Sequence, residues 1–298
     1  MEEYTGTDLA SESLAEGEDL PAGIRRSEHQ SGGFTVQTIR VCNRSAAEQI
    51  GKPIGTYLTL DCGRTDRLDA DGRERLAHVL SGELRGLCEA ACGKRPDPEL
   101  NLLIVGLGNA SLTADAIGPL TVRRLTATAH LRACDPDLYR KLGCCSVSIL
   151  AAGVLGQSGI EAGTLVKTVV REISPDAVLA IDALAARDLE RLASTVQLSD
   201  AGIVPGSGVG NRRSELTRDA LGVPVLALGI PTVVGSSTLV WDALARAGIR
   251  EPSPELRDVL NNGKDFFVSL KESDAVTEQT CAIFARAVSL AFLGGIEA

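Results

Sequence analysis

Residues 102–119, LLIVGLGNASLTADAIGP, contain the clearest structural pattern of the chain. The first four are an unbroken apolar run, typical of a strand that is buried on both faces. Gly106 and Gly108 follow, and because glycine has no Cβ atom the backbone can turn sharply there. Asp115 comes next, and the glycine–proline pair at 118–119 suits a first helical turn. We therefore expect a strand, a tight loop and a helix, with a carboxylate at the strand's carboxyl end, where open parallel sheets bind ligands.

Strand and helix patterns alternate on both sides of this stretch. Apolar or β-branched runs predict strands at 34–41, 56–61, 101–106, 146–151, 177–182, 195–198 and 223–229. Apolar residues at helical spacing predict helices at 69–92, 120–129, 160–173, 183–193, 236–247 and 277–293, with a polar linker at 250–263. Short connections favour βαβ units, so we expect an α/β protein with a mostly parallel (mixed) twisted sheet and helices on both faces.

The first 32 residues differ in composition from the remainder. Seven acidic residues precede Arg25, the first basic one, and glycine, serine and proline are frequent. Such a composition is typical of a solvated, flexible segment. We therefore expect an acidic flexible segment at 1–32 and a single α/β domain at 33–298.

Composition also bears on partners and cofactors. The formal charge is −9 without a long basic run, so we expect no direct nucleic-acid partner and no anionic membrane surface. No signal-peptide pattern or membrane-spanning run is evident, and the eight irregularly spaced cysteines suit reduced thiols of a cytoplasmic protein. The three histidines are scattered, so we expect no metal site and no cofactor.

Two aspartates are the leading catalytic candidates. Asp115 and Asp182 each follow an apolar strand, and parallel strands bring their carboxyl ends to one edge of the sheet. Two close carboxylates cannot both ionise easily, so one can act as general acid while the other activates water. The alternative is that each Asp caps a helix or orders a loop.

Other polar residues near these strands are weaker candidates. Asp200 follows another strand and either organises a glycine-rich loop or provides a spare acid. Arg187, with Arg212 and Arg213, either binds acidic side chains of a substrate or is simply solvated.

Two common motifs do not fit. The loop at 106–111 lacks the third glycine of a dinucleotide fingerprint, because Ser111 stands there, and no acidic residue follows at the usual distance. Ser207 lies between two glycines, but Pro205 replaces the first glycine of a nucleophile elbow and no histidine follows.

Six stretches together resemble the bacterial germination protease family, the spore endopeptidases of sporulating firmicutes. They are TDLASE at 7–12, GTYLTL at 55–60, IVGLGN at 104–109, TADAIGP at 113–119, AIDALAAR at 180–187 and PGSGVGN at 205–211. The likeness runs from about residue 7 to 234, and the last two motifs in this order are the most specific.

The resemblance implies an atypical aspartic-type endopeptidase, made as a zymogen in the forespore or spore core, which degrades small acid-soluble spore proteins at germination. The family's two proposed catalytic aspartates fall in the motifs matched by Asp115 and Asp182. Asp200, Arg187, Asn109 and Gly108 are candidates for supporting residues beside these two aspartates. The resemblance also implies a homo-oligomer, a tetramer, and a phosphorylase/hydrolase-like fold related to the hydrogenase-maturation endopeptidases.

The family resemblance also suggests self-processing. Its substrates are cut between an acidic and an apolar residue, in an element similar to residues 7–12. Here that bond joins Asp8 and Leu9. A substrate-like segment on the same chain reaches the active site at a high effective concentration.

The sequence departs from the family pattern in three places. Ala114 stands where proline often precedes the first aspartate, Gly235 replaces an aspartate, and residues 250–276 form a shorter region than in longer members. Two alternatives stay open: a metal-assisted maturation endopeptidase of the hydrogenase-processing type, and a non-catalytic binding protein of the same fold. Peptidyl-tRNA hydrolase begins similarly, but the chain lacks its histidine-containing segment and basic face.

Overall fold

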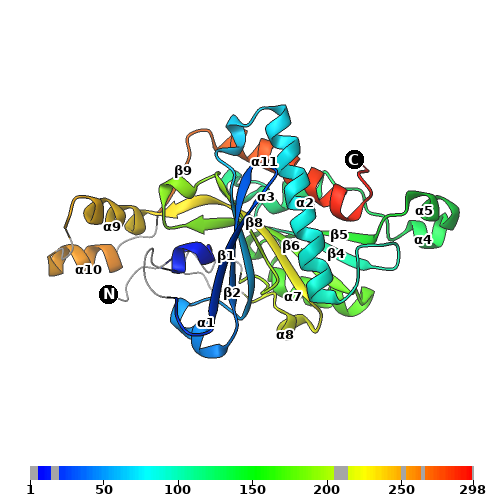
Figure 1. The fold of residues 1–298 in the computed structure, drawn as a ribbon, viewed down its shortest axis with the longest axis horizontal. Coiled ribbons are helices and arrows are strands. Elements are labelled where there is room, and N and C mark those ends of the chain that lie inside the picture. The colour runs from blue at the N-terminus through cyan, green and yellow to red at the C-terminus, as the bar shows by residue number, and fades with distance from the viewer. Residues whose placement is uncertain (1–5, 15–19, 205–213, 250–252, 263–265, 297–298) are drawn as a thin grey trace.

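A nine-stranded mixed sheet runs through the molecule (Figure 1). The computed structural model describes residues 6–14, 20–204, 214–249, 253–262 and 266–296. The strand order is β1-β2-β3-β7-β8-β6-β4-β5, with β9 paired to β8. The strands are β1 (Ile24–Ser31), β2 (Phe34–Val41), β3 (Gly55–Asp61), β4 (Asn101–Leu107), β5 (Ser146–Gly153), β6 (Ala177–Ala186), β7 (Thr195–Ser199), β8 (Val225–Gly235) and β9 (Phe267–Ser269).

Parallel pairing is confined to one half of the sheet. Strands β8, β6, β4 and β5 run parallel, whereas β1, β2, β3 and β7 pair antiparallel with their neighbours, and β7 meets β8 antiparallel. The expectation of an α/β protein with a mixed sheet is confirmed, but the expectation that the sheet is mostly parallel is wrong. A tight turn at residues 32–33 joins β1 to β2, and so short a connection produces antiparallel neighbours. The chain reaches β3 from β2 through residues 42–54, which contain helix α1 (Arg44–Ile50).

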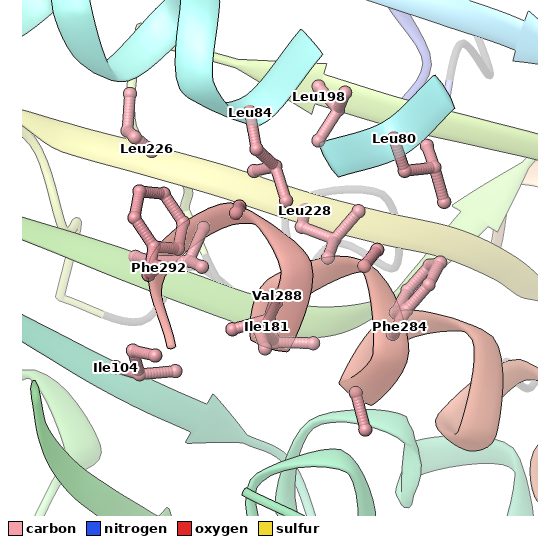
Figure 2. Packing of buried hydrophobic residues seen from close by; sticks show 14 of the residues in the cluster. Leu80, Leu84, Ile104, Ile181, Leu198, Leu226, Leu228, Phe284, Val288 and Phe292 are labelled. Atoms are coloured by element: carbon pink, nitrogen blue, oxygen red, sulfur yellow. The ribbon is translucent and has the colours of Figure 1, made fainter. Parts of the chain in front are cut away.

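Two long helices cover one face of the sheet. Helix α2 (Ala70–Cys92) begins where Asp69 accepts a hydrogen bond from the Gly72 N–H and ends at Gly93, which has a left-handed backbone. It packs against α11 (Ser273–Phe292), and α3 (Ile117–Val122) lies beside α11. Figure 2 shows side chains of both helices meeting those of the central strands, with Leu84, Val288 and Phe292 lying close to Ile181 and Leu228.

The opposite face carries a second core. Helix α7 (Ala162–Ile173) buries Val166 and Val170 against alternate residues of the parallel strands, such as Val178 and Ala180. The remaining helices are α1 (Arg44–Ile50), α4 (Leu131–Cys134), α5 (Pro136–Leu142), α6 (Leu155–Ser158), α8 (Arg218–Leu221), α9 (Ser236–Arg246) and α10 (Pro254–Asn262). Four short 3₁₀ turns are η1 (Ala10–Ser13), η2 (Thr65–Arg67), η3 (Thr113–Asp115) and η4 (Leu189–Arg191). Helices on both faces agree with the expectation from sequence.

Three local predictions are wrong. Residues 183–186 continue β6 instead of starting a helix, because their backbone pairs with β8 up to Val234. The helix after Pro119 ends at Val122, since Thr128 bonds Cys145 and Val147 and draws the chain to β5. The expected linker at 250–263 contains α10, whose first residue is a proline, a position that suits proline.

The N-terminal segment is hydrogen-bonded to the sheet at residues 7–12 and 24–31, although the side chains at 25–30 are exposed. Strand β1 pairs along its whole length with β2, and residues 7–12 lie against β6 and β7. Residues 7–12 are therefore buried in part, contrary to the expected solvation, whereas most side chains of β1 are exposed to solvent. Hydrogen bonds to the sheet and burial of Leu9 outweigh the polar composition.

Candidate active site

The Asp115 turn packs directly on the end of β4. The backbone N–H of Asn109 donates to the carbonyl oxygen and to Oδ2 of Asp115, both at 2.9 Å. Gly108 has φ +107°, and a Cβ atom there would lie 2.1 Å from the Asp115 carbonyl oxygen. Gly108 is thus needed for the close approach that fixes η3. Asn109 also accepts a hydrogen bond from Gln157 at 2.7 Å.

Asp182 lies in β6, the strand beside β4, and is buried. Its Oδ1 accepts the N–H of Ala183 at 2.9 Å. The segments that carry the two aspartates touch one another, because a Cβ atom on Gly118 would lie 2.3 Å from the carbonyl oxygens of Ile181 and Leu107. Thr232 of β8 adds a hydrogen bond of 2.6 Å to the carbonyl of Ala114. Both aspartates therefore lie near the carboxyl end of β4. Asp182 does not follow its strand as expected but lies within β6, which continues to Ala186.

Asp200 does not lie near this end of β4. Strand β7 runs antiparallel to β8, so its last residue, Ser199, pairs with Ala227, nearer the amino end of β8 than Gly229. Asp200 accepts the N–H of Thr56 at 2.5 Å and donates its own N–H to the Thr56 carbonyl. The suggestion that Asp200 is a spare acid beside Asp182 is therefore wrong, and its contacts fix β3 to the end of β7.

Of the three candidate arginines, only Arg187 lies among the residues that the structure describes. Arg187 follows β6 and is exposed, and its backbone N–H, instead of its guanidinium, bonds the N-terminal segment. Arg212, Arg213 and the glycine-rich motif at 205–211 lie outside the described residues.

Residues 7–12 lie along the free edge of β6 beyond the end of β4. The Asp8 N–H donates to the Ala185 carbonyl at 2.9 Å, and the Ala185 N–H donates to Oδ2 of Asp8 at 2.8 Å. The two oxygens of Glu12 accept the N–H groups of Arg187 and Asp188, each at 2.8 Å. One backbone hydrogen bond, and three more through the carboxylates of Asp8 and Glu12, therefore hold the segment to backbone groups of β6 and the residues after it. Ala10–Ser13 forms the 3₁₀ turn η1 within the segment.

Side chains complete this docking. Leu9 is fully buried in a cluster with Leu184, Ala186, Leu192 and Val234. The ammonium group of Lys52 donates to the Thr7 carbonyl at 2.7 Å. Burial lowers the pKa of Lys52, while the nearby carboxylates of Asp8 and Glu12 oppose that shift.

Gln197 of β7 holds the backbone on both sides of Leu9. Its Oε1 accepts the Ala10 N–H at 2.7 Å, and its Nε2 donates to the Asp8 carbonyl oxygen at 2.9 Å. Neither Gln197 nor Lys52 is among the site residues expected from the sequence. The one signal for Gln197 was a large polar residue inside an otherwise β-branched and apolar strand, TVQLS.

Comparison with known proteins assigns the chain to a family. The sequence profile described as Germination protease matches residues 7–247. The chain belongs to the germination protease family. It is 37% identical over 278 residues to the germination protease of Clostridium perfringens, covering 86% of this chain and 83% of that protein. It is 40% identical over 245 residues to the one of Bacillus subtilis, covering 80% of this chain and 65% of that protein.

Family membership makes this chain an endopeptidase. The region matched by the germination protease profile contains Asp115, Asp182 and the docked segment. It also contains Gln197, so all the contacts described above lie within the family region. Among the helices that the structure describes, none is long and apolar enough to cross a membrane.

Proposed function

We propose that this endopeptidase begins the degradation of small acid-soluble spore proteins at germination, in the spore core, and that it is made as a self-processing zymogen. The docking of residues 7–12 is the observation that supports this most strongly. The acidic residues Asp8 and Glu12 are held by backbone groups of β6 and the residues that follow it, and the apolar Leu9 is buried against Leu184. A substrate with the same order of residues would find the same partners once the segment is displaced.

In this proposal Asp115 and Asp182 act as general acid and general base. One carboxylate takes a proton from water as its oxygen attacks the peptide carbonyl, and the other gives a proton to the departing amine. The glycines at 108 and 118 let the Asp115 segment pack on the end of β4 and against Ile181 of β6, the residue before Asp182, which supports the pairing.

The cut during self-processing is proposed at Asp8–Leu9. The segment is docked against β6, and its backbone is extended at Leu9, directly before the 3₁₀ turn η1. N-terminal sequencing of matured protein is expected to give Leu9 in the wild type and the intact start in Asp182→Asn. A mutant chain that is processed when expressed alone would show that another protease makes the cut.

One experiment tests both the proposed substrate and the alternative of a metal-assisted maturation endopeptidase. Incubation with a small acid-soluble spore protein is expected to give cleavage that persists with a chelator. Loss of cleavage with chelator would favour the metal-assisted maturation type instead. Among the residues that the structure describes, no three His, Cys, Asp or Glu side chains are grouped as ligands for a metal ion. Absence of cleavage in matured protein would favour a binding protein.

We also propose that the chain forms a homo-oligomer, a tetramer in the arrangement implied by the family. Exposed apolar side chains on α10 and around β9 support this, among them Val259, Phe266 and Phe267. Exposed apolar patches on soluble proteins commonly mark interaction surfaces. Sedimentation analysis is expected to give a mass several times that of the 31.2 kDa chain, and a stable monomer would contradict the proposal.

A further inference from the structure

Gln197 and Asp182 stand in one row across the sheet. Gln197 pairs with Gly229 of β8, and Gly229 pairs with Asp182 of β6. Residues directly opposite on paired strands point to the same face, and two strand spacings separate these Cα atoms by about 10 Å. The neighbours of Gln197, Val196 and Leu198, lie in the α2 core, so the Gln197 side chain points to the other face.

The docked segment lies on that same face. Ala180 belongs to the core under α7, which places Asp182, two residues further, on the face away from α2. Leu184 covers Gly229, because a Cβ atom there would lie 2.6 Å from its Cγ. Leu184 also packs against Leu9. The row therefore places Gln197 and Asp182 on two sides of the surface that receives Leu9.

The orientation of the Gln197 amide is fixed by chemistry. The Ala10 N–H can only donate and the Asp8 carbonyl can only accept, so Oε1 faces Ala10 and Nε2 faces Asp8. Gln197 is nine-tenths buried, which strengthens a hydrogen bond to a developing charge. The carbonyl that Nε2 contacts is the carbonyl of the Asp8–Leu9 peptide bond.

We propose that Gln197 is a further catalytic residue, which polarises the carbonyl of the bond to be cut and stabilises the oxyanion that forms on it. This rests on the proposed cleavage at Asp8–Leu9. Water oxygen bonds to the Asp8 carbonyl carbon, the π electrons move onto the carbonyl oxygen, and a carboxylate takes the water proton. The oxyanion electrons then re-form the C=O bond as the C–N bond breaks; the C–N electron pair goes to the Leu9 nitrogen, which takes a proton from the other carboxyl group. Gln197 donates throughout and exchanges no proton.

The same side chain also clamps the substrate backbone, and the two roles make different predictions. A clamp contributes equally to the docked state and to the transition state, so its removal slows cutting only as much as it weakens docking. An oxyanion donor contributes more to the transition state. Its removal therefore slows cutting beyond the loss of docking.

Two variants of the full chain separate these roles. Gln197→Met keeps the volume and removes both hydrogen bonds, whereas Lys52→Met removes a docking contact to the Thr7 carbonyl, which belongs to a different peptide bond. Cutting is followed by mass as the chain beginning at Leu9 appears. Docking is followed by hydrogen exchange of residues 7–14 in chains that also carry Asp182→Asn.

For Gln197→Met we expect cutting to fall by about 100-fold or more beyond the measured loss of docking, the effect typical of a lost oxyanion donor. For Lys52→Met we expect the fall in the rate of cutting to equal the loss of docking. Equal losses in Gln197→Met as well would overturn the proposal and leave Gln197 as a clamp.

The same variants distinguish a failure of the proposed aspartate mechanism from a failure of the proposed role of Gln197. If Asp115→Asn and Asp182→Asn still cut while Gln197→Met does not, the aspartate assignment fails and that of Gln197 stands. If both aspartate variants are inactive and Gln197→Met cuts at the wild-type rate, Gln197 alone is excluded. A wild-type chain that is never cut at Asp8–Leu9 overturns both.

Discussion

The carboxylates of Asp115 and Asp182 each accept a hydrogen bond from a nearby backbone N–H, of Asn109 and Ala183 respectively. An asparagine oxygen can accept the same bond, so Asp115→Asn and Asp182→Asn should leave the fold intact. Each is expected to lower proteolysis by about 100-fold or more through loss of proton transfer. Because residues that act as a unit lose activity non-additively, the double variant should be about as inactive as either single variant. Cleavage of a spore-protein substrate and circular dichroism are the measurements, and full activity of either variant would end the assignment.

Glycines at the Asp115 turn are predicted to be irreplaceable for steric reasons. A Cβ atom on Gly118 would lie 2.3 Å from two backbone oxygens, which cannot move without displacing β4 or β6. Gly118→Ala is therefore expected to lower the free energy of unfolding by about 1–3 kcal/mol, as overpacked cores do.

The matched control is a glycine with free space around it. Gly86 lies exposed within α2, and a Cβ atom there meets nothing within 4 Å. Gly86→Ala should raise the free energy of unfolding by about 0.5–1 kcal/mol through helix propensity. Urea denaturation measures both changes, and equal effects of the two substitutions would refute the steric explanation.

At the scale of elements, the segment at 7–12 depends on Leu9. Truncating a fully buried leucine costs about 2–5 kcal/mol, which we expect to exceed what holds this short segment in place. Leu9→Ala should therefore release residues 7–12 to hydrogen exchange and proteolysis while strands β4, β6 and β8 stay protected. Leu20→Ala, at an exposed leucine, is the control. Unchanged protection of residues 7–12 in Leu9→Ala would show that the hydrogen bonds to β6 suffice.

At the scale of the whole molecule, Arg64 links distant parts of the chain by bonding Asp66 of η2 at 2.7 Å and Glu272, which precedes α11, at 3.3 Å. The hydrogen bond from Arg64 holds the pKa of Asp66 below its ordinary value of 3.8. A carboxylate whose pKa is lower in the folded state stabilises that state above its ordinary pKa, and this stabilisation is lost as pH falls below about 4.

Asp66→Asn should therefore lower the melting temperature at pH 7 and have a smaller effect at pH 3. Glu48→Gln, which breaks an exposed pair with Arg44, should change little at either pH. Thermal denaturation at both pH values is the measurement. An Asp66→Asn effect that is as large at pH 3 as at pH 7 would contradict this role.

The sequence by itself determined the strand–loop–helix around Asp115, the strand before Asp182, and the apolar stripes of α2 and α11. Each of these depends on local periodicity and on glycine geometry, which a single segment contains. The same local patterns misassigned residues 183–186, whose alanines and leucine favour a helix in isolation. Pairing with β8 overrode that preference.

Only the tertiary structure decided which strands became neighbours and in which direction they run. An alternating pattern determines the face of a residue but not its partner strand, since pairing depends on segments far apart in sequence. The antiparallel course of β7 took Asp200 away from the end of β4 where Asp115 lies and brought Gln197 into the row of Asp182. The free edge of β6 then received residues 7–12, whose polar composition alone indicated exposure to solvent, because their donors and acceptors match that edge.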